Sequence, residues 1–226
     1  MSAPTSGTVD RATVERLVRE AVMRRLGRPV RPDGYRPKLV VNISARHMHV
    51  SQEHLEILFG PGAKLTPMRM LYQEGQFAAE QTVTLIGPRH RMITNLRILG
   101  PVRKESQIEL AFTDGIALGI DLPVRMSGDI EGTPGGIVMG PAGHVVLEKG
   151  IIRAERHVHM SPQDADYYGV SNGDRMALRV ESRCPMTIHG IVCRVDPSFK
   201  LEVHLDTDEG NACDLPNAKY VELIKE

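Results

Sequence analysis

Two short segments of the chain share the pattern Arg-His-x-His-x-Ser, with histidines at His47 and His49 in one copy and at His157 and His159 in the other. A separation of about 110 residues is typical of repeated domains rather than of short solenoid repeats. In an extended strand, side chains two residues apart point to the same face, so each pair of imidazoles converges. Two converging imidazoles form half of a metal site. We therefore interpret both copies as metal-binding motifs.

Further ligands must come from other parts of the chain. His204 lies on another predicted strand, in EVHLDTDEGN, and Glu109 lies in GPVRKESQIEL. Nitrogen-rich ligation with one carboxylate suits zinc best, with cobalt, iron and manganese as alternatives. The strand pleat turns Arg46 and Arg156 away from the histidines, so we expect them to orient the motifs through ion pairs. The other histidines that lack a partner at ligand spacing are expected to be structural: His54, His90, His144 and His189.

The composition limits the class of protein. The chain has 226 residues, 41% of them hydrophobic, and its 28 basic side chains balance 28 acidic ones. We therefore expect a globular protein that binds no nucleic acid. No apolar run is long enough for a membrane span and no secretion signal is evident, so the expected location is cytoplasmic. The three cysteines form no Cys-x-x-Cys pair, which leaves histidine to carry any metal.

The first part of the chain predicts one amphipathic helix within residues 1–27. Its apolar residues recur at helical spacing. They are Val14, Leu17, Val18, Ala21, Val22 and Leu26. The next segment, 28–37, contains three prolines and a glycine and is predicted to be a semi-rigid linker. Two interpretations of the helix remain: docking on the body or on a second subunit, or a tethered targeting segment.

The remainder of the chain, from Lys38 onward, alternates short β-prone runs with Gly and Pro punctuation. This pattern predicts a mainly β fold with two small β-barrel domains. The runs include KLVVNIS, QTVTLIG, QIELAF, GIALGI, GIVMG, MTIHGIVCRV and KLEVHLDT. After each histidine motif a serine is placed to cap a brief helix: Ser51 in the first copy, and Ser161 before Pro162 in the second.

Several long motifs occur in an order that resembles the phosphate propanoyltransferase family, metal-dependent phosphotransacylases often housed in bacterial microcompartments. They are SARHMHVS, GQFAAEQTVTLIGP, LGPVRKESQIEL, RMSGDIEGTPGGIVMGPAG, ERHVHMSPQDADYYGVSNGD and HLDTDEGNAC. The resemblance covers the chain from about Leu39 to Leu215. It implies a first, discontinuous β-barrel formed by 38–46 and 155–226, a second barrel formed by 47–154, and a dinuclear zinc site between them.

The resemblance also implies an activity and a set of site residues. The activity is the interconversion of a short acyl-CoA, propanoyl-CoA or acetyl-CoA, and phosphate with an acyl phosphate and coenzyme A. The implied metal ligands are His47, His49, Glu109, His157, His159 and His204, and they would hold two zinc ions. Arg103 falls at the position of the phosphate-binding arginine of the family. A homodimer enclosed in a microcompartment is implied, with the N-terminal helix binding shell or cargo proteins.

Two other functions compete with this interpretation. A dinuclear zinc hydrolase also uses His-x-His pairs, but HMHVSQ lacks the acid and histidine of the β-lactamase-like pattern His-x-His-x-Asp-His. A non-catalytic microcompartment scaffold would account for the N-terminal helix. It gives no reason for five histidines to converge.

Overall fold

The computed structural model of the chain describes residues 10–25 and 34–226. The helices are α1 (Arg11–Arg25), α2 (Gln52–Phe59), α3 (Phe112–Leu118), α4 (Pro162–Tyr168), α5 (Thr207–Ala212) and the 3-10 helix η1 (Leu215–Asn217). The first strands are β1 (Val40–Ser44), β2 (His47–His49), β3 (Pro67–Met70), β4 (Phe77–Ile86), β5 (Met92–Gly100), β6 (Gln107–Glu109) and β7 (Val124–Arg125). The later strands are β8 (Gly136–Met139), β9 (His144–Leu147), β10 (Ile151–Ala154), β11 (His157–Met160), β12 (Arg175–Glu181), β13 (Met186–Val195), β14 (Glu202–Asp206) and β15 (Tyr220–Lys225).

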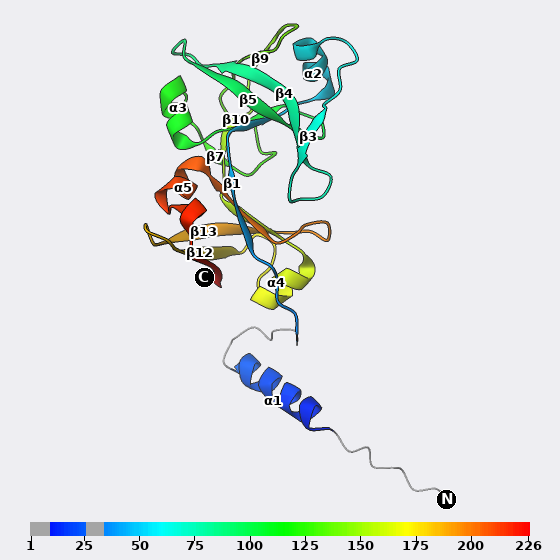
Figure 1. The fold of residues 1–226 in the computed structure, drawn as a ribbon, viewed down its shortest axis with the longest axis vertical. Coiled ribbons are helices and arrows are strands. Elements are labelled where there is room, and N and C mark those ends of the chain that lie inside the picture. The colour runs from blue at the N-terminus through cyan, green and yellow to red at the C-terminus, as the bar shows by residue number, and fades with distance from the viewer. Residues whose placement is uncertain (1–9, 26–33) are drawn as a thin grey trace, which may run out of the picture.

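The strands form two sheets, one in each half of the body (Figure 1). The six-stranded sheet has the order β1-β14-β11-β13-β12-β15. The nine-stranded sheet has the order β7-β10-β6-β2-β5-β4-β8-β9, and β3 pairs with β4 beside this path. Each sheet curls into a half-barrel. The prediction of a mainly β fold built on two barrel-like sheets with few, short helices is therefore confirmed.

The chain passes between the two sheets immediately before each histidine motif. Two residues, Ala45 and Arg46, separate β1 in the six-stranded sheet from β2 in the nine-stranded sheet. Two residues, Glu155 and Arg156, separate β10 in the nine-stranded sheet from β11 in the six-stranded sheet. Both His-x-His pairs thus begin a strand at the point where the chain enters a new sheet.

Each half has its own hydrophobic core. One core contains fully buried side chains such as Met48, Leu85 and Ile98, and the other is centred on residues such as Met176 and Val203. Burying these apolar side chains is the main driving force for folding each half. The middle residue of each motif, Met48 or Val158, lies in one of these cores. The neighbouring histidines therefore point to the opposite face of the strand.

The two serine caps form as predicted. Ser51 Oγ accepts from the backbone N–H of His54 (3.2 Å) at the start of α2. Ser161 Oγ accepts from the backbone N–H of Asp164 (3.2 Å) at the start of α4. Each cap satisfies a backbone donor that the first helical turn leaves free. The helices that follow the histidine motifs therefore begin at fixed residues.

One β-prone run of the sequence is not a strand. Most of GIALGI, residues 115–120, lies in helix α3 instead. The Asp114 carboxylate accepts from the backbone N–H of Ala111 (3.2 Å) and stabilises the first turn. Gly119, with φ of 78°, ends the helix in the left-handed conformation. The strand prediction was wrong because apolar content without alternation does not distinguish a short helix from a strand.

The predicted amphipathic helix corresponds to α1 within the described residues. Four of its apolar side chains, Val14, Leu17, Val18 and Val22, are exposed. Leu26 and the first part of the predicted linker lie outside the described residues. In the part of the chain that the structure describes, no helix is both long enough and apolar enough to cross a membrane.

Candidate metal centre

The first cluster of possible ligands combines His47 and His49 of β2 with Glu109 of β6. These strands are antiparallel, and their register places His47 directly opposite Glu109. His47 Nε2 lies 3.5 Å from Glu109 Oε2 and 3.2 Å from His49 Nε2. All three side chains are buried. Two nitrogens and one carboxylate oxygen therefore converge on one point, as a metal site requires.

The second cluster consists of His157 and His159 of β11 with His204 of β14. The antiparallel register places His157 directly opposite His204, just as His47 lies opposite Glu109. The three ring centroids are 4.7 to 4.8 Å apart. The three possible nitrogen ligands lie within 4.8 Å of one another. This cluster offers three nitrogen ligands.

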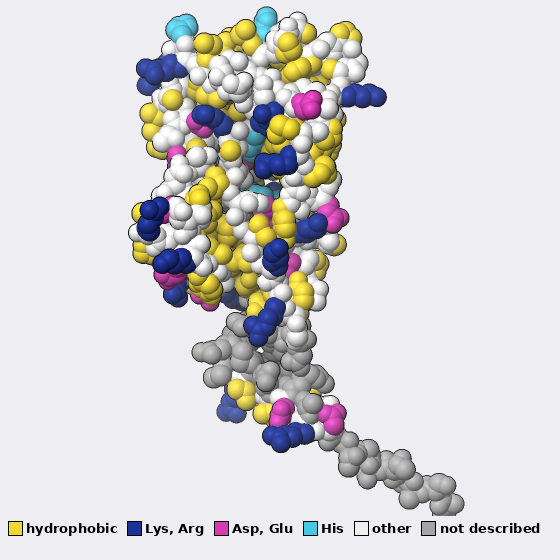
Figure 2. Space-filling view, viewed as in Figure 1, with side chains coloured by type: hydrophobic (Ala, Val, Ile, Leu, Met, Phe, Trp, Pro, Cys, Tyr) yellow, Lys and Arg dark blue, Asp and Glu magenta, His cyan; other side chains and the backbone are white. Residues whose placement is uncertain are grey.

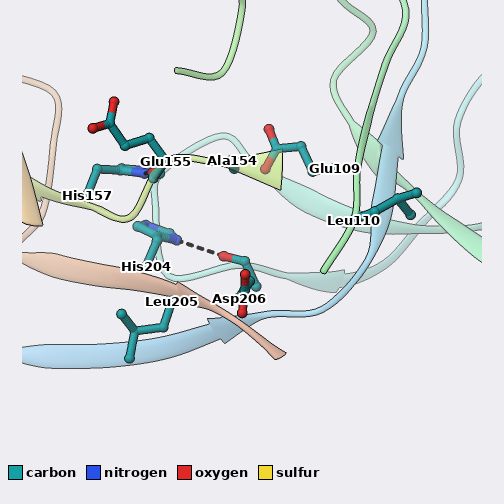
Figure 3. A pocket seen from close by; sticks show the side chains of 9 residues that line it. Glu109, Leu110, Ala154, Glu155, His157, His204, Leu205 and Asp206 are labelled. Carbon is teal, nitrogen blue, oxygen red and sulfur yellow. Dashed lines mark hydrogen bonds between the residues drawn. The ribbon is translucent and has the colours of Figure 1, made fainter. Parts of the chain in front are cut away.

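Glu109 connects the two clusters. A pocket between the half-barrels is lined by Glu109 of one cluster and by His157 and His204 of the other, which lie around one space in Figure 3. In Figure 2, histidine side chains are visible in a hollow between the halves, close to basic side chains. Burial alone would raise the pKa of Glu109, but His47, His49, a hydrogen bond with Ser127 and then His157 hold it below its ordinary value. The carboxylate is thus in electrostatic contact with histidines of both sheets.

The backbone fixes one histidine of each pair in the same way. His47 Nδ1 lies 2.8 Å from the carbonyl oxygen of Ala45, and His157 Nδ1 lies 2.8 Å from the carbonyl oxygen of Glu155. A carbonyl oxygen only accepts, so each Nδ1 carries the hydrogen and donates it. The Nε2 atom then keeps its lone pair. This arrangement presents the ring as a neutral metal ligand.

Several buried ring nitrogens have no hydrogen-bond partner among the described residues: His49 Nδ1 and both ring nitrogens of His159. Buried polar atoms are normally paired, so such a group of unpaired nitrogens at one place favours a bound ligand. Burial is also the first cause that lowers the pKa of His49 to about 3 and that of His159 to about 2. These rings are therefore neutral near pH 7. The donor set fits divalent zinc, which is bound by neutral imidazole and carboxylate.

Arg103 lies beside the first cluster. Its backbone N–H donates to the carbonyl of Val50, the residue after His49 (2.9 Å), and its Nη1 donates to Ser127 Oγ (3.1 Å). The side chain is half-buried. Burial is the main cause that lowers the pKa of its guanidinium, and the nearby Glu109 carboxylate opposes this shift. Among the described residues no carboxylate forms an ion pair with Arg103. A half-buried, unpaired guanidinium suits an anionic ligand.

Three functional candidates were not predicted from the sequence. Gln107 donates to Glu109 Oε1 (2.7 Å) and to Ser127 Oγ (2.9 Å). Gln107 and Ser127 therefore support the first cluster. Arg194 of β13 pairs in register with His159, and its charge also lowers the pKa of Arg103. Two features of the sequence could have pointed to these residues: Gln107 lies two residues before Glu109, and Arg194 is a charged residue within the apolar run GIVCRV.

The other expectations for arginines and histidines are met where the structure tests them. Arg46 pairs with Asp114 (2.7 Å) and Arg156 pairs with Glu209 (3.0 Å), so the predicted ion pairs are confirmed. His54 Nδ1 lies 2.8 Å from Ser106 Oγ, outside both clusters. These contacts hold the segments around the motifs.

Comparison with known proteins supports the resemblance seen in the motifs. The sequence pattern of the phosphate propanoyltransferase family matches residues 40–216. A phosphate propanoyltransferase of Planctopirus limnophila is 56% identical over 97% of this chain and 93% of its own. Those of Thermotoga maritima and Lachnoclostridium phytofermentans are 50% and 47% identical, over 84% and 81% of this chain and 90% and 86% of theirs. The chain therefore belongs to the phosphate propanoyltransferase family, a family of transferases.

Proposed function

We propose that this enzyme transfers a short acyl group between coenzyme A and phosphate at a dinuclear zinc site between the two half-barrels. The observation that carries the proposal is the pair of facing ligand clusters, each with three convergent donor atoms, beside an unpaired arginine. The proposed ligands are His47, His49 and Glu109 for one ion, and His157, His159 and His204 for the other. The 38–46 and 155–226 segments are proposed as one domain and 47–154 as the other.

In the reaction, a phosphate oxygen attacks the thioester carbonyl, the carbon–sulfur bond breaks, and coenzyme A leaves as a thiolate. Arg103 would bind two phosphate oxygens through its planar guanidinium and hold the nucleophile in position. Arg194 lies close enough to Arg103 to add positive charge to the same anion site. When bound, two zinc ions supply positive charge that offsets the phosphate and stabilises the departing thiolate.

The chain's own residues keep the site ready for this chemistry. Gln107 and Ser127 fix the Glu109 carboxylate and the Arg103 guanidinium through hydrogen bonds of 2.7 to 3.1 Å. Preorganised groups of this kind lose little free energy to reorganisation when charge develops. No serine or cysteine nucleophile is part of the proposal, so we expect no covalent acyl-enzyme intermediate.

The N-terminal helix carries the second part of the proposal. Its exposed Val14, Leu17, Val18 and Val22 supply an apolar surface suited to a groove on a partner. We assign this surface to a microcompartment shell or cargo protein. A homodimer and enclosure in a microcompartment complete the proposal.

The test is an assay with propanoyl-CoA or acetyl-CoA, with and without phosphate. Free thiol reports coenzyme A release, and hydroxylamine traps any acyl phosphate as a hydroxamate. The proposed activity requires thiol and hydroxamate to rise together, and only when phosphate is present. Thiol release without phosphate would instead indicate a zinc hydrolase, and no thiol release under either condition would indicate a scaffold.

A further inference from the structure

Glu202 is a buried carboxylate beside the second cluster. Its side chain on β14 lies two residues before His204, and the residue is 3% exposed. Glu202 Oε2 lies 3.2 Å from His204 Nε2. Asn42 Nδ2 donates to Oε1, and Gln73 Nε2 donates to Oε2 at 2.6 Å. Two amides therefore hold this carboxylate in contact with a proposed metal ligand.

No Lys or Arg of the described residues lies within ion-pair distance of the Glu202 carboxylate. Its ion-pair contact is with His204. A buried carboxylate without a cation is costly. A divalent ion on the histidines next to it would remove that cost. The location of the charge thus favours a cation in the second cluster.

The two clusters place this charge at different positions of equivalent strand pairs. In the first, β6 supplies Glu109 as the carboxylate and Gln107 as its hydrogen-bonding neighbour. In the second, β14 supplies His204 opposite His157 and Glu202 opposite His159. The register gives Glu202 the position that Gln107 holds in the first pair of strands. Each cluster consequently contains one buried carboxylate, although on different positions of the strand.

Gln73 supports Glu202 from the other half of the molecule. It lies between β3 and β4, strands of the nine-stranded sheet, and is 4% exposed. Besides Glu202, its amide donates to the Lys200 carbonyl (2.9 Å) and accepts from the Lys200 N–H (3.1 Å). The adjacent Glu74 pairs with Lys200 Nζ (2.9 Å). The loop therefore fixes the start of β14 next to the second cluster.

We propose that Glu202 is a positioning residue of the second cluster, held from the opposite half by Gln73, that orients His204 and supplies the charge favouring a divalent cation there. The inference rests on the proposed metal centre and adds a residue to it. Outer-sphere partners of this kind typically change metal affinity by about 10- to 100-fold.

The experiment compares the full-length protein with Glu202→Gln by titrating zinc into metal-free samples against a chromophoric chelator. Wild type is expected to bind two ions, and the variant to bind one with unchanged affinity and the other about 10- to 100-fold more weakly. Glu222→Gln is the matched control, since Glu222 lies on β15 of the same sheet with a side chain 42% exposed. The metal-free variant should have a somewhat lower thermal midpoint than wild type, because a glutamine has one acceptor oxygen for the two amides of Asn42 and Gln73. Structural damage of this kind does not distinguish one zinc ion from the other, so the loss at a single site is the result that supports the inference.

Unchanged affinity for both ions would overturn the inference and leave the proposed centre intact. Weakening of both ions would also overturn it, because Glu202 would then be a general structural residue. A wild-type protein that binds no zinc would overturn both proposals. If Glu202→Gln does not fold, Glu202→Asp replaces it, since this variant keeps the charge but moves it away from His204. A smaller loss of zinc affinity is then expected at the same single site. An affinity equal to that of wild type would contradict the inference.

Discussion

His157 and His204 face each other across antiparallel strands β11 and β14, and their rings stack with centroids 4.8 Å apart and planes 15° apart. In the other sheet the same register position pairs His47 with Glu109. The first histidine of each motif thus lies opposite a possible ligand on the neighbouring strand, which is a histidine in one sheet and a glutamate in the other. The resulting clusters offer three nitrogens in one case and two nitrogens with a carboxylate in the other.

The proposed ligand role of His159 predicts loss of metal in His159→Ala. Removing one of three donors should weaken zinc binding by about 100-fold or more, because partners outside the coordination sphere already contribute about 10- to 100-fold. Acyl transfer should be abolished. Elemental analysis after gel filtration measures the zinc content. His144→Ala, at an exposed histidine of β9, is the control and should retain all zinc; full zinc and normal turnover in His159→Ala would contradict the assignment.

Arg103→Ala should separate phosphate binding from metal binding. Loss of a preorganised donor to a charged reactant lowers turnover by about 100- to 1,000-fold, so kcat/KM for phosphate should fall by that order while zinc content stays unchanged. Steady-state rates at varied phosphate measure the effect. Lys104→Ala, which removes an exposed neighbouring charge, should leave the rate near wild type. Equal losses in both variants would argue against a specific anion site at Arg103.

Acid should destabilise the metal-free protein, because buried histidines resist protonation. The pKa of His49 is lowered to about 3 in the folded state, whereas an unfolded histidine titrates near about 6.5. Between these values the unfolded chain binds more protons than the folded chain. The contribution to the free energy of unfolding that is present above pH about 6.5 is therefore lost as the pH decreases. Each such histidine contributes about 1.4 kcal/mol per pH unit. Urea unfolding from pH 7 to pH 5 measures the slope.

The matched comparison for this pH effect is His49→Gln, which should show a shallower fall over the same range. Zinc should oppose the effect at neutral pH, since the ligands must be deprotonated to hold it. A metal-free protein equally stable at pH 7 and pH 5 would be inconsistent with buried neutral histidines.

Removing the N-terminal helix should leave catalysis intact. A chain beginning at Gly34 keeps Tyr35, whose hydroxyl donates to Asp164 Oδ1 (2.7 Å), and should keep metal and phosphate-dependent activity. It should associate less, because the exposed apolar residues of α1 are gone, and should no longer be recruited to the proposed microcompartment. Light scattering and co-localisation measure the two effects. Leu17→Glu in the full chain is the matched variant, because it replaces one of these exposed apolar side chains. Unfolding or inactivity of the shortened chain would instead make the helix part of the core.

The sequence predicted the mainly β fold and the positions of both histidine pairs because these depend on local patterns. Alternation places His47 and His49 on one strand face whatever the strand pairs with. Ser51 and Ser161 likewise cap their helices through contacts three residues away. Such features need no knowledge of distant segments.

The remainder of the site depends on tertiary contacts. Gln73 meets Glu202 across 129 positions of sequence, and Asn42 meets it across 160. No spacing in a single sequence encodes these pairings, because the first follows from how the two sheets meet and the second from the pairing of β1 with β14. The strand register that sets His157 opposite His204 was equally inaccessible.

The zinc content of the purified protein tests the central claim most directly. Two ligand clusters, each with three donor atoms within 4.8 Å, predict two zinc ions per chain by elemental analysis. Exhaustive chelation should remove both ions together with phosphate-dependent acyl transfer, and added zinc should restore them. Full transfer activity in a protein without zinc, or no zinc bound by the folded wild type, would contradict the account.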